Sequence, residues 1–239
     1  MVTAPLILAR HAYVCHADEH LVFLDLRQDK YLCLGREQSL AVRPFLTESA
    51  IIEHAAVRSM ESGQCIDRAL EVLVENGLLV DDRASGKDAA HVSAELPLSG
   101  MTVGAHGRPA VVKFRDVRNF FGAAVLASTR LRWNSLESTV RRVERRKGAA
   151  KRSAIDRYPR VREHTAVFHA LRRYYPRDYL CLFDSLSLVE FLARYRVFPQ
   201  WVFGVTMEPF RAHCWVQDGS AILNDTVENV RNYTPIMCI

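Results

Sequence analysis

Three residues near the C-terminal end of the sequence have types that suit covalent catalysis: Cys181, His213 and Asp225. Cys181 follows a break at Pro176 and begins the segment CLFDSLSLVEFLAR, whose apolar residues recur at helical spacing. A thiol at a helix start faces unpaired backbone N–H groups and the positive end of the helix dipole, which favour the nucleophilic thiolate. A lone cysteine before an apolar helix is more often a small apolar side chain packed in the core. Cys181 therefore indicates catalysis only if a general base and a residue that orients the base are also present.

Those partners come from a later hairpin. The chain turns back at Asp218-Gly219 between two strand-like runs, AHCWVQ and AILND. His213 lies on the first run and is the side chain best suited to exchange protons near neutral pH. Pairing Asp225 with His213 needs a three-residue loop or a bulge, whereas a strict two-residue turn pairs His213 with Asn224. Both registers remain open, with Asp225 preferred and Asn224 second as the residue that orients the imidazole.

Cysteine at a helix start, followed by histidine and an acidic residue on adjacent strands, is the arrangement of papain-like and transglutaminase-like enzymes. We expect Cys181 to be the nucleophile, His213 the general acid and base, and Asp225 the residue that holds the imidazole. We expect no cofactor for this chemistry. The six cysteines are scattered without a CxxC pair, so we also expect free thiols and no structural zinc.

The elements that carry these residues predict an α+β fold. Helical patterns cover Val112–Arg132, Ser135–Arg146, Arg157–Tyr174 and Cys181–Arg194, and strand patterns cover Trp201–Thr206, Ala212–Gln217 and Ala221–Asp225. We therefore expect a papain-like or transglutaminase-like domain with a helical half and a C-terminal antiparallel sheet.

The N-terminal region predicts a smaller, winged-helix-like domain made of a hairpin and three helices. Strands at Leu21–Leu26 and Tyr31–Leu34 flank the loop Arg27–Lys30, and short helices follow at Glu37–Leu46, Ile51–Met60 and Asp67–Asn76. Gly77 stands where a helix C-cap belongs. The next stretch is polar and without period, so we divide the chain into a domain at 1–83, a linker at 84–108 and a second domain at 109–239.

The composition is that of a globular protein. The 239 residues are 49% hydrophobic and 25% charged, enough apolar material to bury a core, so general disorder is excluded. No run approaches the roughly 18 apolar residues of a membrane span, and Met1–Arg10 lacks the features of a signal peptide. We expect no membrane span and a cytoplasmic location.

Charge is distributed unevenly along the chain. Met1–Ser85 carries a net charge of −5, whereas Arg130–Arg173 carries 14 Arg and Lys against 4 Asp and Glu, a net charge of +10. Such a segment can bind nucleic acid, but regularly spaced charges on helices are more often a solvated face. We expect no nucleic acid partner, and a nucleic-acid-binding regulator remains an alternative.

The motifs around the three residues resemble a known family. CLFDSLSL from Cys181, FRAHCWVQDG through His213, ILND ending at Asp225 and the closing NYTPI are similar to the leader peptidase of lasso peptide biosynthesis, the B protein. The spacings of 32 and 12 residues are also like that family's Cys, His and Asp triad. This resemblance implies a cysteine peptidase that removes the leader of a precursor peptide and frees the core α-amine. A partner lasso cyclase would then use ATP to close the macrolactam.

The N-terminal region resembles the leader-recognition domain of ribosomal peptide pathways. Members bind the precursor leader as an added strand and in the groove beside the third helix. That implies leader contacts on the strands and helix named above, at Leu21, Phe23, Leu26, Tyr31, Leu32, Leu34, Leu70 and Leu73.

Two positions depart from the family pattern. Cys214 stands where alanine is more usual, and strand alternation points it away from His213 into the core. Asp184 replaces an expected basic residue, a difference that would alter substrate contacts. Alternatives to the peptidase are a transglutaminase or acyltransferase with the same triad, and a non-catalytic protein that presents the precursor.

Overall fold

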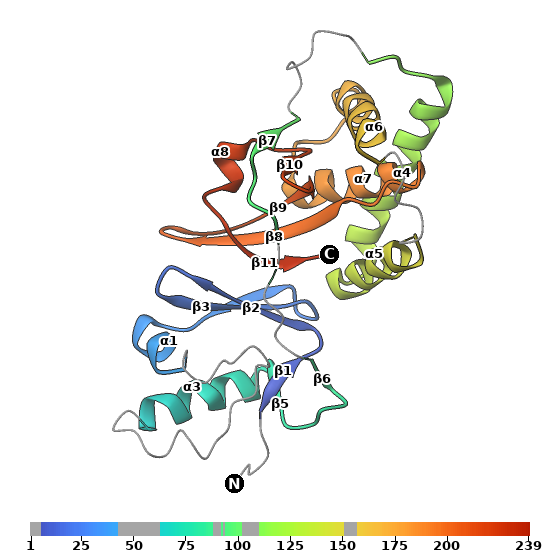
Figure 1. Cartoon of the computed structure of the whole chain (residues 1–239). Coiled ribbons are helices and arrows are strands. Elements are labelled where there is room, and N and C mark those ends of the chain that lie inside the picture. Colours follow the sequence, from blue (N-terminus) through green and yellow to red (C-terminus); the bar gives the residue numbers. More distant parts are fainter. Residues whose placement is uncertain (1–5, 43–62, 88–91, 93, 102–109, 151–156) are drawn as a thin grey trace. The chain divides into compact units, whose positions relative to one another are not determined.

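The computed structural model describes residues 6–42, 63–87, 92, 94–101, 110–150 and 157–239 (Figure 1). The chain forms two compact units. Unit 1 comprises Met1–Ser93 with Val205–Phe210, and unit 2 comprises Ala94–Gly204 with Arg211–Ile239. Helices and strands occur in both, so the predicted α+β class is confirmed. Over the described residues, no helix combines the length and apolar character that crossing a membrane would require.

Unit 1 contains two small sheets and two described helices. The strands pair in the orders β5-β1-β6 and β2-β3-β4. The elements are β1 (Ile7–Ala9), β2 (Ala12–Ala17), β3 (His20–Asp25), β4 (Lys30–Cys33), α1 (Arg36–Val42), α3 (Gly63–Glu75), β5 (Leu79–Val80) and β6 (Gly86–Lys87). Apolar side chains from these strands and helices form one buried cluster that includes Leu8, Phe23 and Leu73.

The predicted hairpin and third helix of unit 1 are confirmed. β3 and β4 pair antiparallel, with Asp25 opposite Lys30 at the loop. α3 ends before Gly77, whose φ of +67° is the left-handed conformation that glycine adopts without a steric penalty. Strands β1 and β2 are additions that the sequence patterns did not predict. The expected helix Ile51–Met60 lies outside the described residues.

Unit 2 joins a helical half to a five-stranded sheet. The helices are α4 (Phe114–Trp133), α5 (Leu136–Ala150), α6 (Arg157–Arg172), α7 (Cys181–Ala193) and the short α8 (Val227–Val230). The strands are β7 (Ser99–Gly100), β8 (Gln200–Met207), β9 (Phe210–Asp218), β10 (Ala221–Ile222) and β11 (Thr234–Cys238), in the order β11-β8-β9-β10-β7. Helices α4 to α7 gather beside this sheet (Figure 1).

The sheet of unit 2 is not wholly antiparallel. β10 pairs antiparallel with β9 but parallel with β7, which comes from the segment expected to be a linker. A second part of that segment, β6, pairs with β1 in unit 1. The polar, irregular sequence of residues 84–108 therefore contributes one short strand to each unit.

Helix α7 is the central element of unit 2. Its residues from Phe183 to Leu192 are all buried, including the polar Asp184, Ser185 and Glu190. Aromatic rings of α4 and α6, Phe120 and Phe168, lie 6.4 and 5.7 Å from the Phe191 ring. This packing fixes the axis of α7, and with it the position of its first residue.

Glu190 on α7 is a buried carboxylate held by two arginines. It accepts hydrogen bonds from the Arg130 guanidinium of α4 and, at 2.6 and 3.0 Å, from the Arg146 guanidinium of α5. Glu190 is 2% exposed, so its charge is compensated by protein groups and not by water. This ion cluster joins α4, α5 and α7.

Removing the Glu190 carboxylate should destabilise unit 2 strongly. Glu190→Ala leaves the buried Arg130 without its acid, and we expect the free energy of unfolding to fall by about 3–5 kcal/mol. The exposed helical pair Arg141 and Glu137 supplies the control, because Arg141→Ala should cost only about 0.3–0.5 kcal/mol. All three tryptophans lie in unit 2, so tryptophan fluorescence during urea unfolding follows this unit. Equal losses from the two variants would contradict the role of Glu190.

Candidate active site

Cys181 is the first residue of α7, as its sequence context predicted. It is exposed, and the residue before it, Leu180, is the N-cap with an extended backbone. At this position the Cys181 N–H has no acceptor within the helix, so it remains available to a ligand. The nucleophile candidate therefore stands at the open, positive end of a buried helix.

Asp184 fixes the start of α7. Its Oδ2 accepts the Leu180 N–H at 2.8 Å, and its Oδ1 pairs with the Arg172 guanidinium of α6. Arg172 also donates to two carbonyls of the loop that precedes Cys181, both at 3.0 Å. The Asp184 carboxylate is buried and bonded to the protein itself, so any effect of Asp184 on substrate contacts would act through the position of the helix start.

Ser185, one turn after Cys181, ties α7 to the sheet. Its hydroxyl donates to the Cys214 carbonyl of β9 at 3.0 Å and accepts from Asn224 Nδ2 at 2.9 Å. The other end of the Asn224 amide accepts the Val216 N–H at 2.7 Å. The side chain of Asn224, the alternative orienting residue, therefore bridges α7 and β9. Neither of its two hydrogen bonds goes to His213.

His213 and Asp225 form a side-chain hydrogen bond between the His213 Nε2 and an Asp225 carboxylate oxygen. The strand register that brings them together differs from both registers considered from the sequence. Ala221 pairs with Asp218, so the two-residue turn is Gly219-Ser220. β10 then ends at Ile222, and Asp225 reaches His213 from the irregular segment that follows the strand.

The Asp225 carboxylate is held by the start of the short helix α8. One oxygen accepts the Thr226 N–H at 2.7 Å, and Asn229 Nδ2 lies 3.1 and 3.0 Å from the two oxygens. The Thr226 hydroxyl in turn caps α8 by accepting the Asn229 N–H at 3.2 Å. Asn229 and Thr226 were missed from the sequence, although the pattern Thr-x-x-Asn directly after Asp225 is a possible helix-capping signal.

The His213 ring is confined by aromatic neighbours. The Trp215 ring stacks at a centroid distance of 6.1 Å, and the Tyr233 ring lies 5.0 Å away. With Nε2 bonded to Asp225, the other ring nitrogen, Nδ1, is the one left to serve Cys181. The Cys181 sulfur and the His213 ring interact, and each shifts the pKa of the other. The three residues therefore form one continuous chain of contacts.

These contacts shift the proton affinities of the three groups in a consistent direction. Hydrogen bonds from the Cys214 thiol and from His213 outweigh burial and lower the pKa of Cys181 to about 4. Burial opposes protonation of His213, but its bonds with Asp225 and Cys181 prevail and raise its pKa to about 9. Burial favours the neutral Asp225, but hydrogen bonds from His213 and its other donors lower the pKa of this carboxyl. At neutral pH the pair is a thiolate and an imidazolium.

The eight residues expected to contact a leader all lie in unit 1. Leu21, Phe23, Leu26, Leu34, Leu70 and Leu73 are buried at 2% exposure or less, whereas Tyr31 and Leu32 on β4 are half-buried. The buried members support the sheet and α3 from inside, and Tyr31 and Leu32 are the two with accessible side-chain surface. Over the described part of the chain, His, Cys, Asp and Glu side chains form no group of three or more suited to a metal ion.

The sequence of unit 2 matches a family model. Residues 123–238 match the transglutaminase-like superfamily, and this range contains the cysteine, histidine and aspartate described above. No curated protein and no solved structure matched the chain. The matched range includes both α7, which begins at Cys181, and β9, which carries His213. Residues 123–238 therefore constitute a transglutaminase-like domain.

Proposed function

We propose that this protein is a cysteine peptidase that removes the leader from a lasso peptide precursor, with Cys181, His213 and Asp225 as its catalytic residues. The observation that supports this most directly is the hydrogen bond between the His213 ring and the Asp225 carboxylate, next to a Cys181 sulfur that interacts with the same ring. The similarity of the surrounding motifs to the lasso leader peptidases supplies the substrate class.

In the first half of the reaction, the Cys181 thiolate attacks the scissile carbonyl carbon and forms a tetrahedral oxyanion. The Cys181 N–H, at the start of α7, would donate a hydrogen bond to this developing charge. The His213 imidazolium then protonates the leaving amine as the C–N bond breaks. The core peptide leaves with a free α-amine, and the leader remains attached to Cys181 as a thioester.

In the second half, the neutral His213 takes a proton from water, which attacks the thioester carbonyl. Collapse of the second oxyanion breaks the C–S bond and restores the thiolate, and the leader leaves with a new carboxylate. Asp225 holds the imidazole in place through both halves and favours its charged form. Tyr179 and Leu180, 72% and 50% exposed directly before Cys181, offer apolar surface to the residues around the scissile bond.

The leader itself would bind unit 1. β4 is an edge strand of the described sheet β2-β3-β4, so its outer backbone groups suit an added peptide strand. Tyr31 and Leu32 on β4 present side-chain surface beside that edge. Tethering the leader to the same chain raises the effective concentration of the cleavage site at Cys181.

The test is incubation of the protein with a candidate precursor, encoded by a neighbouring short reading frame whose core contains an internal Asp or Glu, in the presence of an added primary amine. Mass spectrometry should show two fragments whose masses sum to the precursor plus one water. Incorporation of the amine in place of water would identify an acyltransferase instead. An intact precursor that remains bound would indicate a presenting protein, and salt-sensitive binding of DNA without cleavage would indicate the regulator.

Asn229 should act as a positioning residue for Asp225. Asn229→Ala removes two hydrogen bonds to the carboxylate, and we expect kcat to fall by about 10- to 100-fold while KM changes little. Since those bonds help to lower the pKa of Asp225, protonation of this carboxyl in the variant should add to that of Cys181, and the acid limb of kcat/KM should move to higher pH. Asn232→Ala is the matched control, because Asn232 Nδ2 donates to the Glu228 backbone carbonyl at 3.0 Å, whereas Asn229 Nδ2 bonds Asp225. A similar loss in both variants, without the pH shift, would make Asn229 merely structural.

A further inference from the structure

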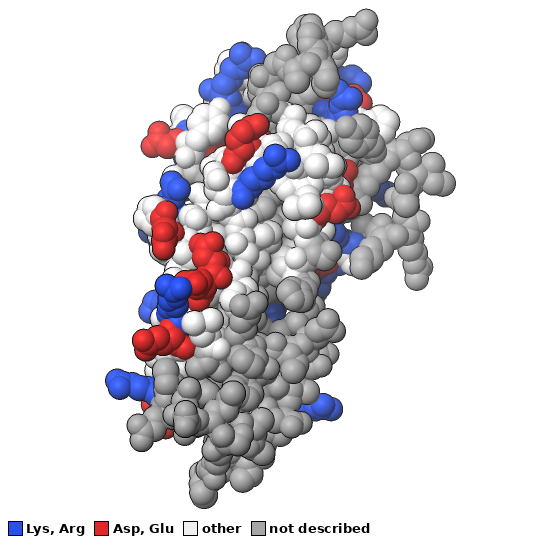
Figure 2. Space-filling view, turned by 60° about the vertical axis from the view of Figure 1, so that its left-hand side comes forward, with Lys and Arg blue, Asp and Glu red and all other residues white. Residues whose placement is uncertain are grey.

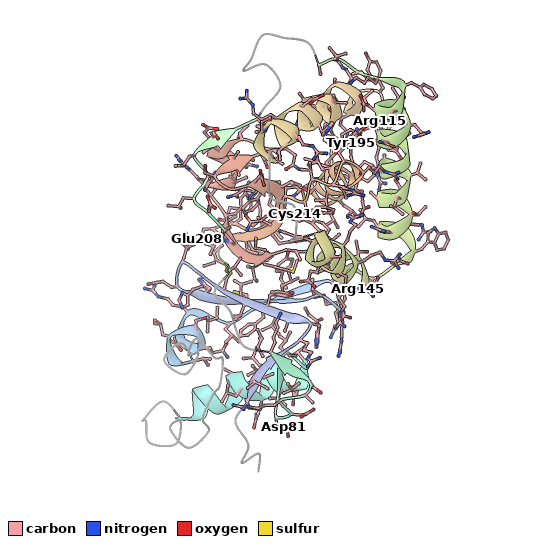
Figure 3. The ribbon with its side chains drawn as sticks, turned by 45° about the vertical axis from the view of Figure 1, so that its right-hand side comes forward. Asp81, Arg115, Arg145, Tyr195, Glu208 and Cys214 are labelled. Carbon is pink, nitrogen blue, oxygen red and sulfur yellow. The ribbon has the colours of Figure 1, made fainter. Side chains whose placement is uncertain are left out.

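A second thiol lies directly behind the nucleophile. Cys214 follows His213 on β9 and is 2% exposed, whereas Cys181 is open to solvent. Figure 3 places Cys214 in the interior of unit 2, beside the strands of the sheet. The start of α7 lies against this strand residue, because the Ser185 hydroxyl, one turn after Cys181, donates to the Cys214 carbonyl at 3.0 Å. The Cys214 thiol and backbone N–H also interact with the Cys181 sulfur and lower the pKa of Cys181. The two sulfurs are therefore neighbours, although the residues are far apart in the sequence.

The early end of β10 explains this contact. β10 pairs with β9 only as far as Ile222, and Asn224 then bonds the Val216 N–H with its side chain. Because alternate N–H groups of a strand point to the same edge, the Cys214 N–H points to the same side as that of Val216. No strand residue of β10 covers that position, and the Cys181 sulfur takes the place of an acceptor there.

We propose that Cys181 and Cys214 form a redox site, in which a peroxide oxidises Cys181 and Cys214 then closes a reversible disulfide with it. This chemistry depends on the two thiols and not on which peptide the enzyme cleaves. Cys214 thereby acts as the resolving cysteine that prevents irreversible oxidation of the nucleophile.

The reaction balances in two steps. The Cys181 thiolate attacks one oxygen of hydrogen peroxide, an S–O bond forms and the O–O bond breaks, and the departing hydroxide takes up a proton as water. The Cys214 sulfur then attacks the sulfur of the Cys181 sulfenic acid. An S–S bond forms, the S–O bond breaks, and the leaving hydroxide receives the Cys214 proton. Two thiols and one peroxide give one disulfide and two waters.

The asymmetry of the two thiols suits this order of events. The oxidant reaches the exposed Cys181, which is a thiolate, but not the enclosed Cys214. Burial raises the pKa of Cys214 well above its usual value, and the adjacent Cys181 raises it further. Conversion of Cys181 to a neutral sulfenic acid removes this second contribution, so oxidation of the first thiol prepares the second to react.

The test uses tryptic peptides that each contain one of the two cysteines, residues 178–194 and 212–231. The full-length protein is treated with a small excess of hydrogen peroxide, free thiols are blocked with iodoacetamide, and the digest is analysed without reductant. We expect the two peptides to appear cross-linked at a mass about 2 Da below their sum, and to separate after dithiothreitol. A digest in which Cys181 is oxidised but the peptides are not linked would overturn the proposal.

Two variants sharpen this result. Cys214→Ala should form sulfinic and sulfonic acid at Cys181, which dithiothreitol does not reverse, whereas the wild type recovers at least about 10-fold more of its reduced Cys181 peptide. Cys33→Ala, which removes an exposed thiol of unit 1, should behave like the wild type. Equal recovery in Cys214→Ala and wild type would contradict a resolving role. The wild-type digest tests for the Cys181–Cys214 disulfide even if Cys214→Ala folds poorly. Because the measurement uses peptide masses and not activity, it also holds if the protein cleaves no precursor.

Discussion

Replacing Cys181 with alanine should bring leader removal below detection, a loss of about 10⁶-fold in kcat when a hydrolase loses its nucleophile. The methyl group cannot form the thioester, and no other exposed thiol among the described residues contacts His213. Product masses read over a time course measure the loss. The precursor should still bind with unchanged affinity, because the expected leader contacts lie in unit 1.

The matched control for this experiment is Cys15→Ala. Cys15 is another free thiol, but it lies on β2, at the edge of the sheet opposite β4, and burial raises its pKa to about 12. This variant should process the precursor at the wild-type rate. Normal cleavage by Cys181→Ala would eliminate the proposed peptidase mechanism, whereas loss of binding in that variant would point to misfolding.

Asp225→Asn should lower kcat/KM by about 10²- to 10⁴-fold, the range of general acid–base contributions. The amide is nearly isosteric and can still accept a hydrogen bond from His213, but it lacks the charge that favours the imidazolium. Comparison with Asp225→Ala, which also removes the bond, separates charge from orientation. Wild-type rates in Asp225→Asn would exclude Asp225 from the catalytic machinery.

The pH dependence supplies a second measurement of the same residue. Cys181 must be deprotonated and His213 protonated, so activity should lie between the pKa of Cys181, about 4, and that of His213, about 9. In Asp225→Asn the His213 pKa falls because the carboxylate charge that helped to raise it is lost, and the alkaline limb of kcat/KM should move to lower pH. An unchanged alkaline limb would show that Asp225 does not support the charge on His213.

Much of the helical half was predictable because its signals are local. Pro176 cannot continue a helix, and the apolar period after it places Cys181 at the start of α7. The hairpin β3–β4 was predictable for the same reason, since strand patterns and a polar loop lie within one short segment. The proposed chemistry followed from residue types and order alone.

The approach of Asp225 to His213 depended on features that a sequence pattern does not contain. A strand register is inferred by assuming that pairing continues, but here the Asn224 side chain bonds Val216 and β10 ends. The clamp by Asn229 and the anchoring of Asp184 by Arg172 join segments through side-chain geometry. Such contacts become visible only after the backbone has been placed.

Figure 2 shows acidic and basic side chains interspersed over the face in view, with uncharged surface between them. The described charges on this face do not form a continuous basic surface of the kind that nucleic acid binding requires. The strongly basic stretch of the sequence is by itself not a sufficient guide to the partners of the folded chain, because some of its charges are paired inside unit 2.

The arginines at Glu190 and Asp184 show why. Arg130, Arg146 and Arg172 all belong to the segment of net charge +10, yet each binds a carboxylate of α7, which lies outside that segment. Salt screens exposed charges far more than buried ones. Added salt would therefore leave these buried ion pairs largely intact, whereas it would weaken the binding of a polyanion to exposed arginines. These three arginines of the basic stretch are therefore less available to external anions, because carboxylates of the helix that begins at Cys181 already neutralise them.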